Sequence, residues 1–433
     1  MPWIIKIGII ALISIQMYAE VHYIKEPTFN EVTYVETHGD PSNEAIIFVH
    51  GLGDEASKIW QDTAQALQNE YYILLFDLPG FGRSDKSNKL YSPYNYAYFI
   101  NYLAGHFIQK PFHLVGHSMG ASISLKYASM FENIKSLMLI DAAGILNKIA
   151  YSQFLLKEKT QKVTQNNGIV DFVENLPSKL NEFLPLNLDS VLQYNASRKV
   201  LLRSNPSTIA ATALVEEDFS LIPQRVNVNT LIMWGEEDKV APLRTGYVLH
   251  KRIENSKLTM VKDTGHVPIK DAPQIFLNAL QEHLKNHAYQ KEEMTFSSYA
   301  KKIVIENKDK VTLTGHIEHL VIKNSTNIRI KDAKIDELYI EKSDVSIVNS
   351  QLNLEKTTQI LESTLTITAS DIQTIGIELL DSSLDLAGVD ISSLNYTFKS
   401  LNQSRTQNIL FSLCQLNENT LHEMVTLKAY EEF

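Results

Sequence analysis

The chain has 433 residues, of which 44% are hydrophobic and 21% are charged. This length exceeds one ordinary domain and the composition is typical of globular proteins, so we expect two domains. The formal net charge of −10 argues against nucleic acid as a partner. The single cysteine, Cys414, excludes an internal disulfide and a metal site built on several thiolates.

The first residues are apolar. Lys6 precedes an apolar run, Ile7–Ile15, and Ala19 suits the position before a cleavage point. Residues 1–19 are therefore predicted to be a secretory signal peptide. An uncleaved N-terminal anchor and a buried helix are the alternatives. The expected location is secreted or in the cell envelope, periplasmic or membrane-anchored, rather than cytoplasmic.

Residues 20–288 are predicted to form an α/β domain. Short apolar runs alternate there with helical patterns, which indicates a mostly parallel sheet buried on both faces by helices. The expected strands are Val32–Val35, Ala45–His50, Tyr72–Asp77, Phe112–Gly116, Ser136–Asp141, Thr230–Trp234 and Lys257–Val261, and the helices between them include Ala56–Leu67, Asn95–Ile108 and Ala121–Phe131.

One interval of this domain, about residues 144–226, has no good strand pattern. It is predicted to be a helical cap inserted over the sheet, with prolines as breakers. The expected helices are Tyr151–Thr164, Ile169–Glu174 and Asp189–Leu202, and the breakers are Pro177, Pro185 and Pro206. Phe154, Leu155, Phe172, Phe183 and Leu184 are expected to form its packing face rather than a dedicated acyl pocket.

The pattern changes after a polar linker at residues 289–302. Residues 303–433 contain short alternating segments whose starts are 17, 17, 20 and 19 residues apart. The segments are Val311–Leu313, Ile328–Ile330, Val345–Ile347, Leu365–Ile367 and Leu384–Leu386, with turn-like sequences at Ser325, Ser343, Ser363 and Ser382. Such short units must stack on each other to bury their apolar faces, which favours a small parallel β-helix or solenoid of about five coils. An ordinary antiparallel sheet is the alternative.

The strongest local motif is Gly116-His117-Ser118-Met119-Gly120, between a predicted strand and a predicted helix. Glycines on both sides of the serine allow a sharp turn that exposes its hydroxyl group. The preceding motif His50-Gly51-Leu52-Gly53 ends another strand. The backbone N–H groups of Leu52 and Met119 are the expected oxyanion-hole donors. A phosphate loop is disfavoured because the lysine and Ser/Thr of that motif are missing.

Two further strand ends carry a carboxylate and an imidazole. Asp238 lies in Trp-Gly-Glu-Glu-Asp and His266 in Gly-His-Val-Pro. A serine hydroxyl needs a positioned imidazole to take its proton, and the imidazole needs a carboxylate to orient it. Asp141, at another strand end, is the alternative acid.

HGLG, DLPGFGRSD at 77–85, GHSMG, WGEEDKVAP and GHVP follow each other in the order and spacing typical of the α/β-hydrolase superfamily, and the chain resembles that superfamily over about residues 32–284. The resemblance implies an eight-stranded, mostly parallel sheet and a triad of Ser118, Asp238 and His266, with no cofactor and no metal. With a serine as nucleophile, the chain resembles the esterase and lipase branch of the superfamily. The dehalogenase and epoxide-hydrolase branches use aspartate at that position.

The expected function is hydrolysis of a carboxylic ester through an acyl-enzyme, with a small-molecule ester or acyl substrate. A carbon–carbon hydrolase of ring-cleavage products, an amidase and a thioesterase are alternatives with the same triad. A binding or adhesion protein is another, in which the C-terminal repeats contact a protein or a glycan. Association with a membrane or the cell envelope is expected through the N-terminus. His283 and His287 are spaced like zinc ligands but lack a third one, so a solvated helix face is expected there.

Overall fold

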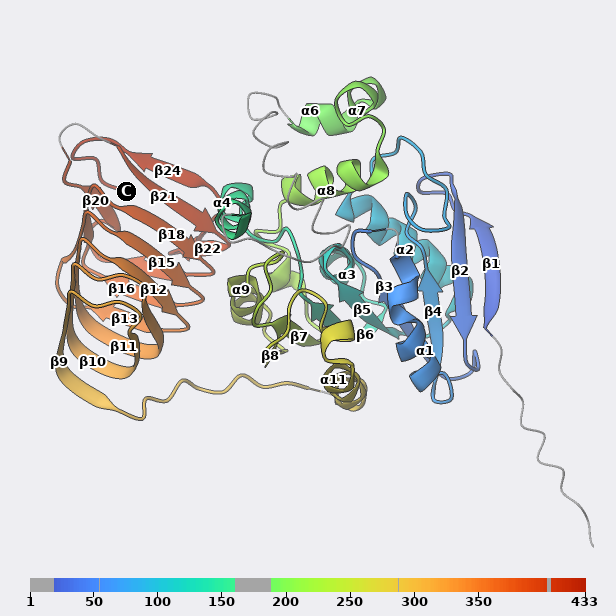
Figure 1. The fold of residues 1–433 in the computed structure, drawn as a ribbon, viewed down its shortest axis with the longest axis horizontal. Coiled ribbons are helices and arrows are strands. Elements are labelled where there is room, and N and C mark those ends of the chain that lie inside the picture. The colour runs from blue at the N-terminus through green and yellow to red at the C-terminus, as the bar shows by residue number, and fades with distance from the viewer. Residues whose placement is uncertain (1–18, 54, 160–187, 287, 403–405) are drawn as a thin grey trace, which may run out of the picture.

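The computed structural model describes residues 19–53, 55–159, 188–286, 288–402 and 406–433, so the predicted signal peptide lies outside the described residues. Figure 1 shows two parts, an α/β domain and a C-terminal curled β-sheet domain, joined by an extended segment. Within the described part of the chain, no helix is both long and apolar enough to cross a membrane.

The N-terminal domain is built on an eight-stranded sheet in the order β1-β2-β4-β3-β5-β6-β7-β8. β1 pairs with β2, and β2 with β4, in antiparallel fashion. The remaining pairs, between β4, β3, β5, β6, β7 and β8 in that order, are parallel. The mostly parallel eight-stranded sheet is thus confirmed. The strands are β1 (Glu20–Lys25), β2 (Val32–His38), β3 (Glu44–Val49), β4 (Tyr71–Phe76), β5 (Phe112–His117), β6 (Ile134–Ile140), β7 (Asn229–Gly235) and β8 (Ser256–Val261).

Helices cover both faces of this sheet. One core cluster joins the sheet to α2, α3 and α9, and a second joins it to η1, α1 and α11. These elements are η1 (Ala56–Trp60), α1 (Gln61–Leu67), α2 (Pro93–Phe107), α3 (Met119–Met130), α9 (Arg244–Arg252) and α11 (Pro273–Lys285), with the short α10 (Pro268–Asp271) before the last. The carboxyl ends of β3, β5, β6 and β7 lie at the same edge of the sheet, because Val49 is paired with Gly116 and Ile140 with Met233.

The described part of the predicted cap contains helices and no strand. They are α4 (Lys148–Lys159), α6 (Leu188–Gln193), α7 (Asn195–Leu201), α8 (Pro206–Glu216) and η2 (Pro223–Arg225). The helix predicted at 169–174 and the end of that at 151–164 lie outside the described residues. Pro206 does not break a helix but begins α8, because proline fits the first helical turn and the Asn205 side chain accepts a 2.9 Å hydrogen bond from the N–H of Thr208.

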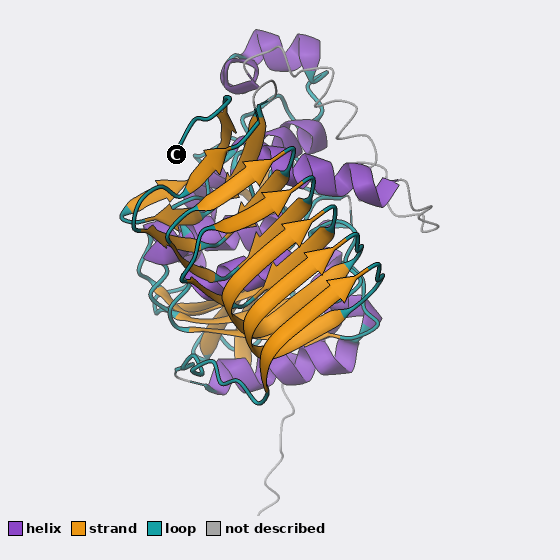
Figure 2. Cartoon of the chain, turned by 90° about the vertical axis from the view of Figure 1, so that its left-hand side faces the viewer, coloured by secondary structure: helices purple, strands orange, loops and turns teal. Residues whose placement is uncertain are grey.

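The C-terminal domain is a large curled sheet of 16 strands (Figure 2). Successive units pair in parallel rather than antiparallel. Three stacks extend from the long strand β11, namely β12-β15-β18-β21, β13-β16-β19-β22 and β14-β17-β20. The first strands are β9 (Tyr299–Glu306), which begins before the predicted start at residue 303, β10 (Thr312–Lys323) and β11 (Ile328–Glu341).

The shorter strands that complete the stacks follow in chain order. They are β12 (Asp344–Val348), β13 (Gln351–Leu354), β14 (Thr358–Leu361), β15 (Thr364–Thr368), β16 (Asp371–Thr374), β17 (Ile377–Leu380), β18 (Ser383–Ala387), β19 (Asp390–Ser393), β20 (Phe398–Ser400), β21 (Gln407–Ser412), β22 (Cys414–Leu416), β23 (Asn419–Leu421) and β24 (Met424–Leu427).

The repeated serines of the sequence explain how the coils turn. The backbone N–H groups of Ser325, Ser343 and Ser363 each donate to the hydroxyl of the serine one coil further on, at 3.1, 3.0 and 3.1 Å, ending at Ser382. A buried backbone donor at a corner would otherwise be unsatisfied. This serine ladder therefore keeps each corner in register with the next one.

The curled domain packs against α9 and the start of the cap. Arg252 pairs with Asp390 at 2.5 Å and donates from Nε to the carbonyl of Leu413 at 2.9 Å. Asn147 donates to the carbonyl of His422 at 2.7 Å. Ala387, Leu410 and Leu413 belong to the same apolar cluster as Val248 and Leu249 of α9. The two domains thus share a continuous core at this contact.

Candidate active site

Ser118 lies on the turn between β5 and α3. Its backbone has φ 55° and ψ −122°, a strained conformation for a residue with a side chain. Only glycine fits on either side, because a Cβ at Gly116 would lie 2.4 Å from the carbonyl oxygen of Gly120, and one at Gly120 2.3 Å from that of Val49. The close approach of strand and helix presents the serine hydroxyl at the carboxyl edge of the sheet.

The structure brings His266 and Asp238 to this serine. His266 Nε2 lies 2.9 Å from Ser118 Oγ, and His266 Nδ1 lies 2.8 Å from Asp238 Oδ2. All three side chains are buried or nearly so. The other oxygen of Asp238, Oδ1, accepts backbone hydrogen bonds from Val240 at 2.7 Å and Ala241 at 3.0 Å. The Asp238 carboxylate is therefore held in one orientation toward the imidazole.

The loops that carry Asp238 and His266 are joined by backbone contacts. Glu237 donates to the carbonyl of Thr264 at 2.9 Å. A Cβ at Gly235 would lie 2.0 Å from the carbonyl oxygen of Gly265. His117 contributes as well, since its Nε2 lies 2.7 Å from the carbonyl oxygen of His266. Burial and the neighbouring His266 lower the pKa of His117 to about 3, so it is a neutral support of the base loop.

Asp141, the alternative acid, lies in a different environment. It is fully buried, and Oδ1 accepts a 2.9 Å hydrogen bond from the N–H of Gly235. Its Oδ2 has no hydrogen-bond partner among the described residues. Burial and the nearby charge of Asp238 raise the pKa of Asp141 well above its ordinary value. The geometry favours Asp238 as the partner of His266, while the raised pKa of Asp141 disfavours its charged form.

The loop His50–Gly53 lies directly against the serine. A Cβ at Gly51 would be 2.8 Å from the Cβ of Ser118, so only glycine permits this approach. His50 Nε2 accepts a 2.8 Å hydrogen bond from the N–H of Leu78, which leaves Nδ1 to donate to the carbonyl of Gly51 at 2.7 Å. Burial lowers the pKa of His50. A neutral imidazole therefore fixes the loop that carries Leu52.

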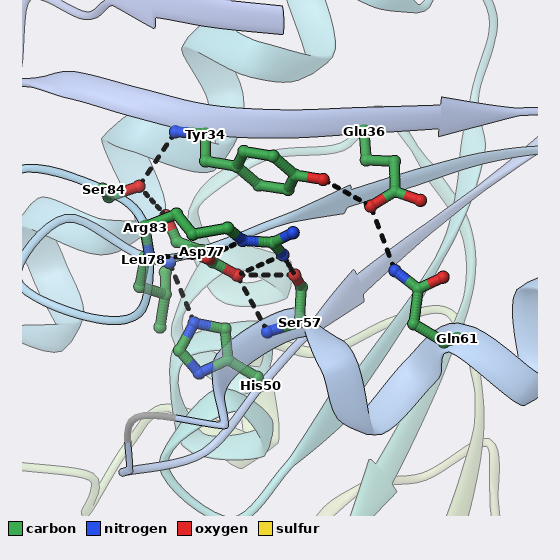
Figure 3. A network of polar contacts seen from close by, with 9 residues as sticks. All are labelled: Tyr34, Glu36, His50, Ser57, Gln61, Asp77, Leu78, Arg83 and Ser84. Carbon is green, nitrogen blue, oxygen red and sulfur yellow. Dashed lines mark hydrogen bonds and ion pairs between the residues drawn. The ribbon is translucent and has the colours of Figure 1, made fainter. Parts of the chain in front are cut away.

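Figure 3 shows the polar network behind this loop. Asp77 accepts hydrogen bonds from the backbone N–H of Ser57 at 3.0 Å and from Arg83 Nε at 2.8 Å. The guanidinium of Arg83 also stacks on the ring of Tyr34, 3.4 Å from its centroid. Burial opposes the charge of Asp77, but the hydrogen bonds from Arg83 and Ser57 lower its pKa to about 2. The DLPGFGRSD motif thus holds both the loop His50–Gly53 and the following helix η1 in place near the serine.

The predicted oxyanion donors lie where the motifs place them. Met119 is the first residue of α3, and Leu52 follows Gly51 in the loop against Ser118. No described residue accepts a hydrogen bond from either backbone N–H. The first N–H groups of a helix lack partners within it and lie at the positive end of its dipole. Both donors are thus available to a ligand beside Ser118.

Metal binding fits these residues poorly. One ligand atom each of His117, Asp141 and His266 lies within 4.8 Å of the others. However, both ring nitrogens of His266 already contact Ser118 and Asp238.

The prediction of a solvated helix face at His283 is wrong, because that imidazole is buried and its Nδ1 lies 3.0 Å from the hydroxyl of Tyr289. His287 lies outside the described residues.

A strained serine between a strand and a helix, at the edge of a mostly parallel sheet, is typical of α/β hydrolases. The comparison with protein families agrees, since the model described as the alpha/beta hydrolase fold matches residues 44–273, more than half of the chain. The chain belongs to this family and is a hydrolase enzyme. The curled β-sheet domain lies outside the matched range.

Several curated relatives are named lipases. Lipase 1 of Psychrobacter immobilis is 27% identical over 257 residues, which cover 56% of this chain and 77% of the relative. Lipase 3 of Moraxella sp. is 26% identical over 273 residues, covering 58% and 81%. The uncharacterized hydrolase YugF of Bacillus subtilis is 26% identical over 267 residues, covering 58% and 94%.

Sequence reasoning missed two contacts around the site. The first is the hydrogen bond between His117 Nε2 and the backbone carbonyl of His266. Tyr151 of α4 donates to the carbonyl of Val240 at 3.0 Å, which ties the cap to the acid loop. The partners are 149 and 89 residues apart in the sequence, so no local pattern could have indicated either contact.

Proposed function

We propose that the protein is a serine hydrolase that cleaves carboxylic esters through an acyl-enzyme. The observation that carries the proposal is the continuous hydrogen-bonded array from Ser118 through His266 to Asp238 at a strained turn. A serine hydroxyl is a weak nucleophile until a base removes its proton, and this array supplies the base and its orienting carboxylate. The relatives named lipases, such as Lipase 1 and Lipase 3, support an ester as the substrate class.

In the proposed first half-reaction, Ser118 Oγ attacks the acyl carbon while its proton passes to His266 Nε2. Asp238 stabilises the imidazolium that forms and holds the tautomer with the proton on Nδ1. The backbone N–H groups of Leu52 and Met119 donate to the developing oxyanion. His266 then gives its proton to the leaving alcohol oxygen as the carbon–oxygen bond breaks.

In the second half-reaction, water replaces the alcohol. His266 takes a proton from the water as the water oxygen attacks the acyl carbon, and the same two N–H groups hold the oxyanion again. The proton returns to Ser118 Oγ as the acid is released. The raised pKa of Asp141 disfavours a second negative charge near the imidazole.

The test is hydrolysis of a series of p-nitrophenyl acyl esters of increasing chain length by the protein lacking residues 1–19. Ester hydrolysis should be measurable in this protein and should vanish in Ser118→Ala. Ser122→Ala is a suitable control, because Ser122 lies one turn further along α3 and donates to the carbonyl of Ala143 instead. If the parent protein is inert toward every ester but cleaves amides, thioesters or carbon–carbon bonds, the ester proposal is wrong while the serine chemistry stands.

We also propose that residues 1–19 direct the protein out of the cytoplasm or anchor it in the cell envelope, as the apolar run Ile7–Ile15 indicates. Fractionation of cells that produce the full chain or the chain without this segment tests the proposal. The full chain should be found in the envelope or medium, and equal distribution of both proteins in the cytoplasm would contradict it.

A further inference from the structure

A cavity of about 390 Å³ lies between the cap helix α4 and the curled sheet. None of its lining residues is Ser118, His266 or Asp238, so it is separate from the candidate active site. Its volume falls within the range of about 300–1,000 Å³ typical of small-molecule sites. In Figure 1, α4 lies beside the strands of the stack that faces the α/β domain.

One wall of this interdomain cavity is apolar. Ala150 and Phe154 are one turn apart on α4, Leu146 precedes that helix, and Pro242 follows the loop of Asp238. Residues spaced by four on a helix share one face. Leu146, Ala150 and Pro242 are buried, so the half-buried ring of Phe154 is the apolar surface that this wall offers to a ligand.

The opposite wall is a polar ladder on the curled sheet. Arg329 of β11 is paired with Ser346 of β12, Ser346 with Thr366 of β15, and Thr366 with Asp385 of β18. All four residues line the cavity. Because neighbouring strands lie about 4.8 Å apart, the ladder presents polar groups at a regular spacing. That spacing is close to the length of one pyranose ring.

Most of these polar groups lack a partner within the described residues. The side chains of Arg329, Ser346 and Thr366 make no hydrogen bond or ion pair there, and neither does the carboxylate of Asp344 beside them. Arg244 uses its two terminal nitrogens to pair with Asp385, while its buried Nε has no partner among the described residues. A buried donor such as this Nε usually has a partner, whereas Arg329 and Asp344 are exposed and Ser346 and Thr366 are half-buried.

The chemistry of the lining selects among ligands. Arg244 and Arg329 are balanced by Asp344 and Asp385, so an anion meets two carboxylates and a cation meets two guanidinium groups. Hydroxyl groups both donate and accept hydrogen bonds, so a polyol satisfies the arginines and the aspartates together. A sugar ring also has an apolar C–H face that can pack on the half-buried ring of Phe154.

We propose that the cavity between α4 and the curled sheet binds a neutral carbohydrate, one or two pyranose residues of a glycan. The hydroxyl groups contact the ladder from Arg329 to Asp385, and one ring face packs on α4. This site would hold the enzyme to a glycan or glycosylated surface through both domains at once. The inference goes beyond the proposed ester hydrolysis and does not depend on it.

The test is binding of three neutral disaccharides, maltose, cellobiose and N,N′-diacetylchitobiose, to the full chain by isothermal titration calorimetry. At least one should bind saturably. Ser346→Trp, which fills the cavity, should weaken that binding at least tenfold. Ser392→Trp is the matched control, because Ser392 is an exposed residue of β19 outside the cavity, and its binding should equal that of the parent protein.

Three results would overturn the proposal. The first is that none of the disaccharides binds. The second is that Ser346→Trp and Ser392→Trp bind the sugar equally well. The third is that inorganic phosphate competes with the sugar, which would make the cavity an anion site. The Ser118→Ala variant should bind the sugar like the parent protein, and loss of binding there would place the sugar in the active site instead.

Discussion

Replacement of Asp238 by asparagine tests which carboxylate orients the base. Asp238 Oδ1 accepts from two backbone N–H groups, so the asparagine oxygen would occupy that position. Its NH₂ group would then lie where Oδ2 now lies, 2.8 Å from His266 Nδ1. Two N–H groups cannot face each other, so the imidazole would carry its proton on Nε2 and could not accept one from Ser118.

The expected loss in kcat is about 10⁴-fold, because a wrong tautomer removes the base but leaves the oxyanion donors in place. That factor corresponds to about 5 kcal/mol of transition-state free energy. Asp141→Asn should cost less than about tenfold, or about 1.4 kcal/mol, since the raised pKa of Asp141 favours its uncharged form and the amide oxygen can still accept from Gly235.

The assay is p-nitrophenyl ester hydrolysis under saturating substrate, with the thermal unfolding midpoint of each variant measured in parallel. Glu237→Gln is the matched control, because Glu237 is an exposed carboxylate next to Asp238 and should keep full activity. The reasoning is refuted if Asp141→Asn loses as much activity as Asp238→Asn while both variants remain folded.

Three further predictions concern stability. Gly120→Ala should lower the thermal unfolding midpoint markedly, because its Cβ would lie 2.3 Å from the carbonyl oxygen of Val49, and a midpoint equal to that of the parent would contradict this. Asp77→Asn should cost about 2 kcal/mol of unfolding free energy above pH 4, because the folded protein lowers the pKa of this carboxylate from 3.8 to about 2. The cost should become progressively smaller as the pH falls through about 2. A difference in urea unfolding that is independent of pH would contradict this. Arg252→Met should weaken the docking of the two domains by about 2 kcal/mol, since it leaves the carbonyl of Leu413 without its donor. It should also accelerate proteolysis between residues 288 and 298. Unchanged cleavage would show that the docking does not depend on this arginine.

The parts of the fold that sequence reasoning predicted well are those with strong local signals. Buried parallel strands are continuous apolar runs, and the tight turn around Ser118 requires glycines at fixed positions, so both are visible in a short window. The order of Asp238 and His266 after the serine follows from the same topology. The structure places these residues at the ends of β7 and β8, where the motifs indicated.

The parts that were missed depend on contacts between distant segments. β1 is short and largely exposed at the sheet edge, so Glu20–Lys25 has no apolar run to mark it. The burial of His283 depends on its contact with Tyr289 beyond the end of its helix. Docking of the curled domain rests on pairs such as Arg252 with Asp390, 138 residues apart. A charged residue on a predicted helix or strand is ordinarily a solvated one, so sequence alone could not indicate a partner.

The central claim is that Ser118 is the nucleophile, and covalent labelling tests it most directly. The protein would be treated with a fluorophosphonate, digested and analysed by mass spectrometry, beside Ser118→Ala and Ser122→Ala. The account predicts a phosphonylated peptide that carries the label on Ser118, the same label in Ser122→Ala and none in Ser118→Ala. A folded parent protein that takes up no label, or takes it up equally in Ser118→Ala, would contradict the account.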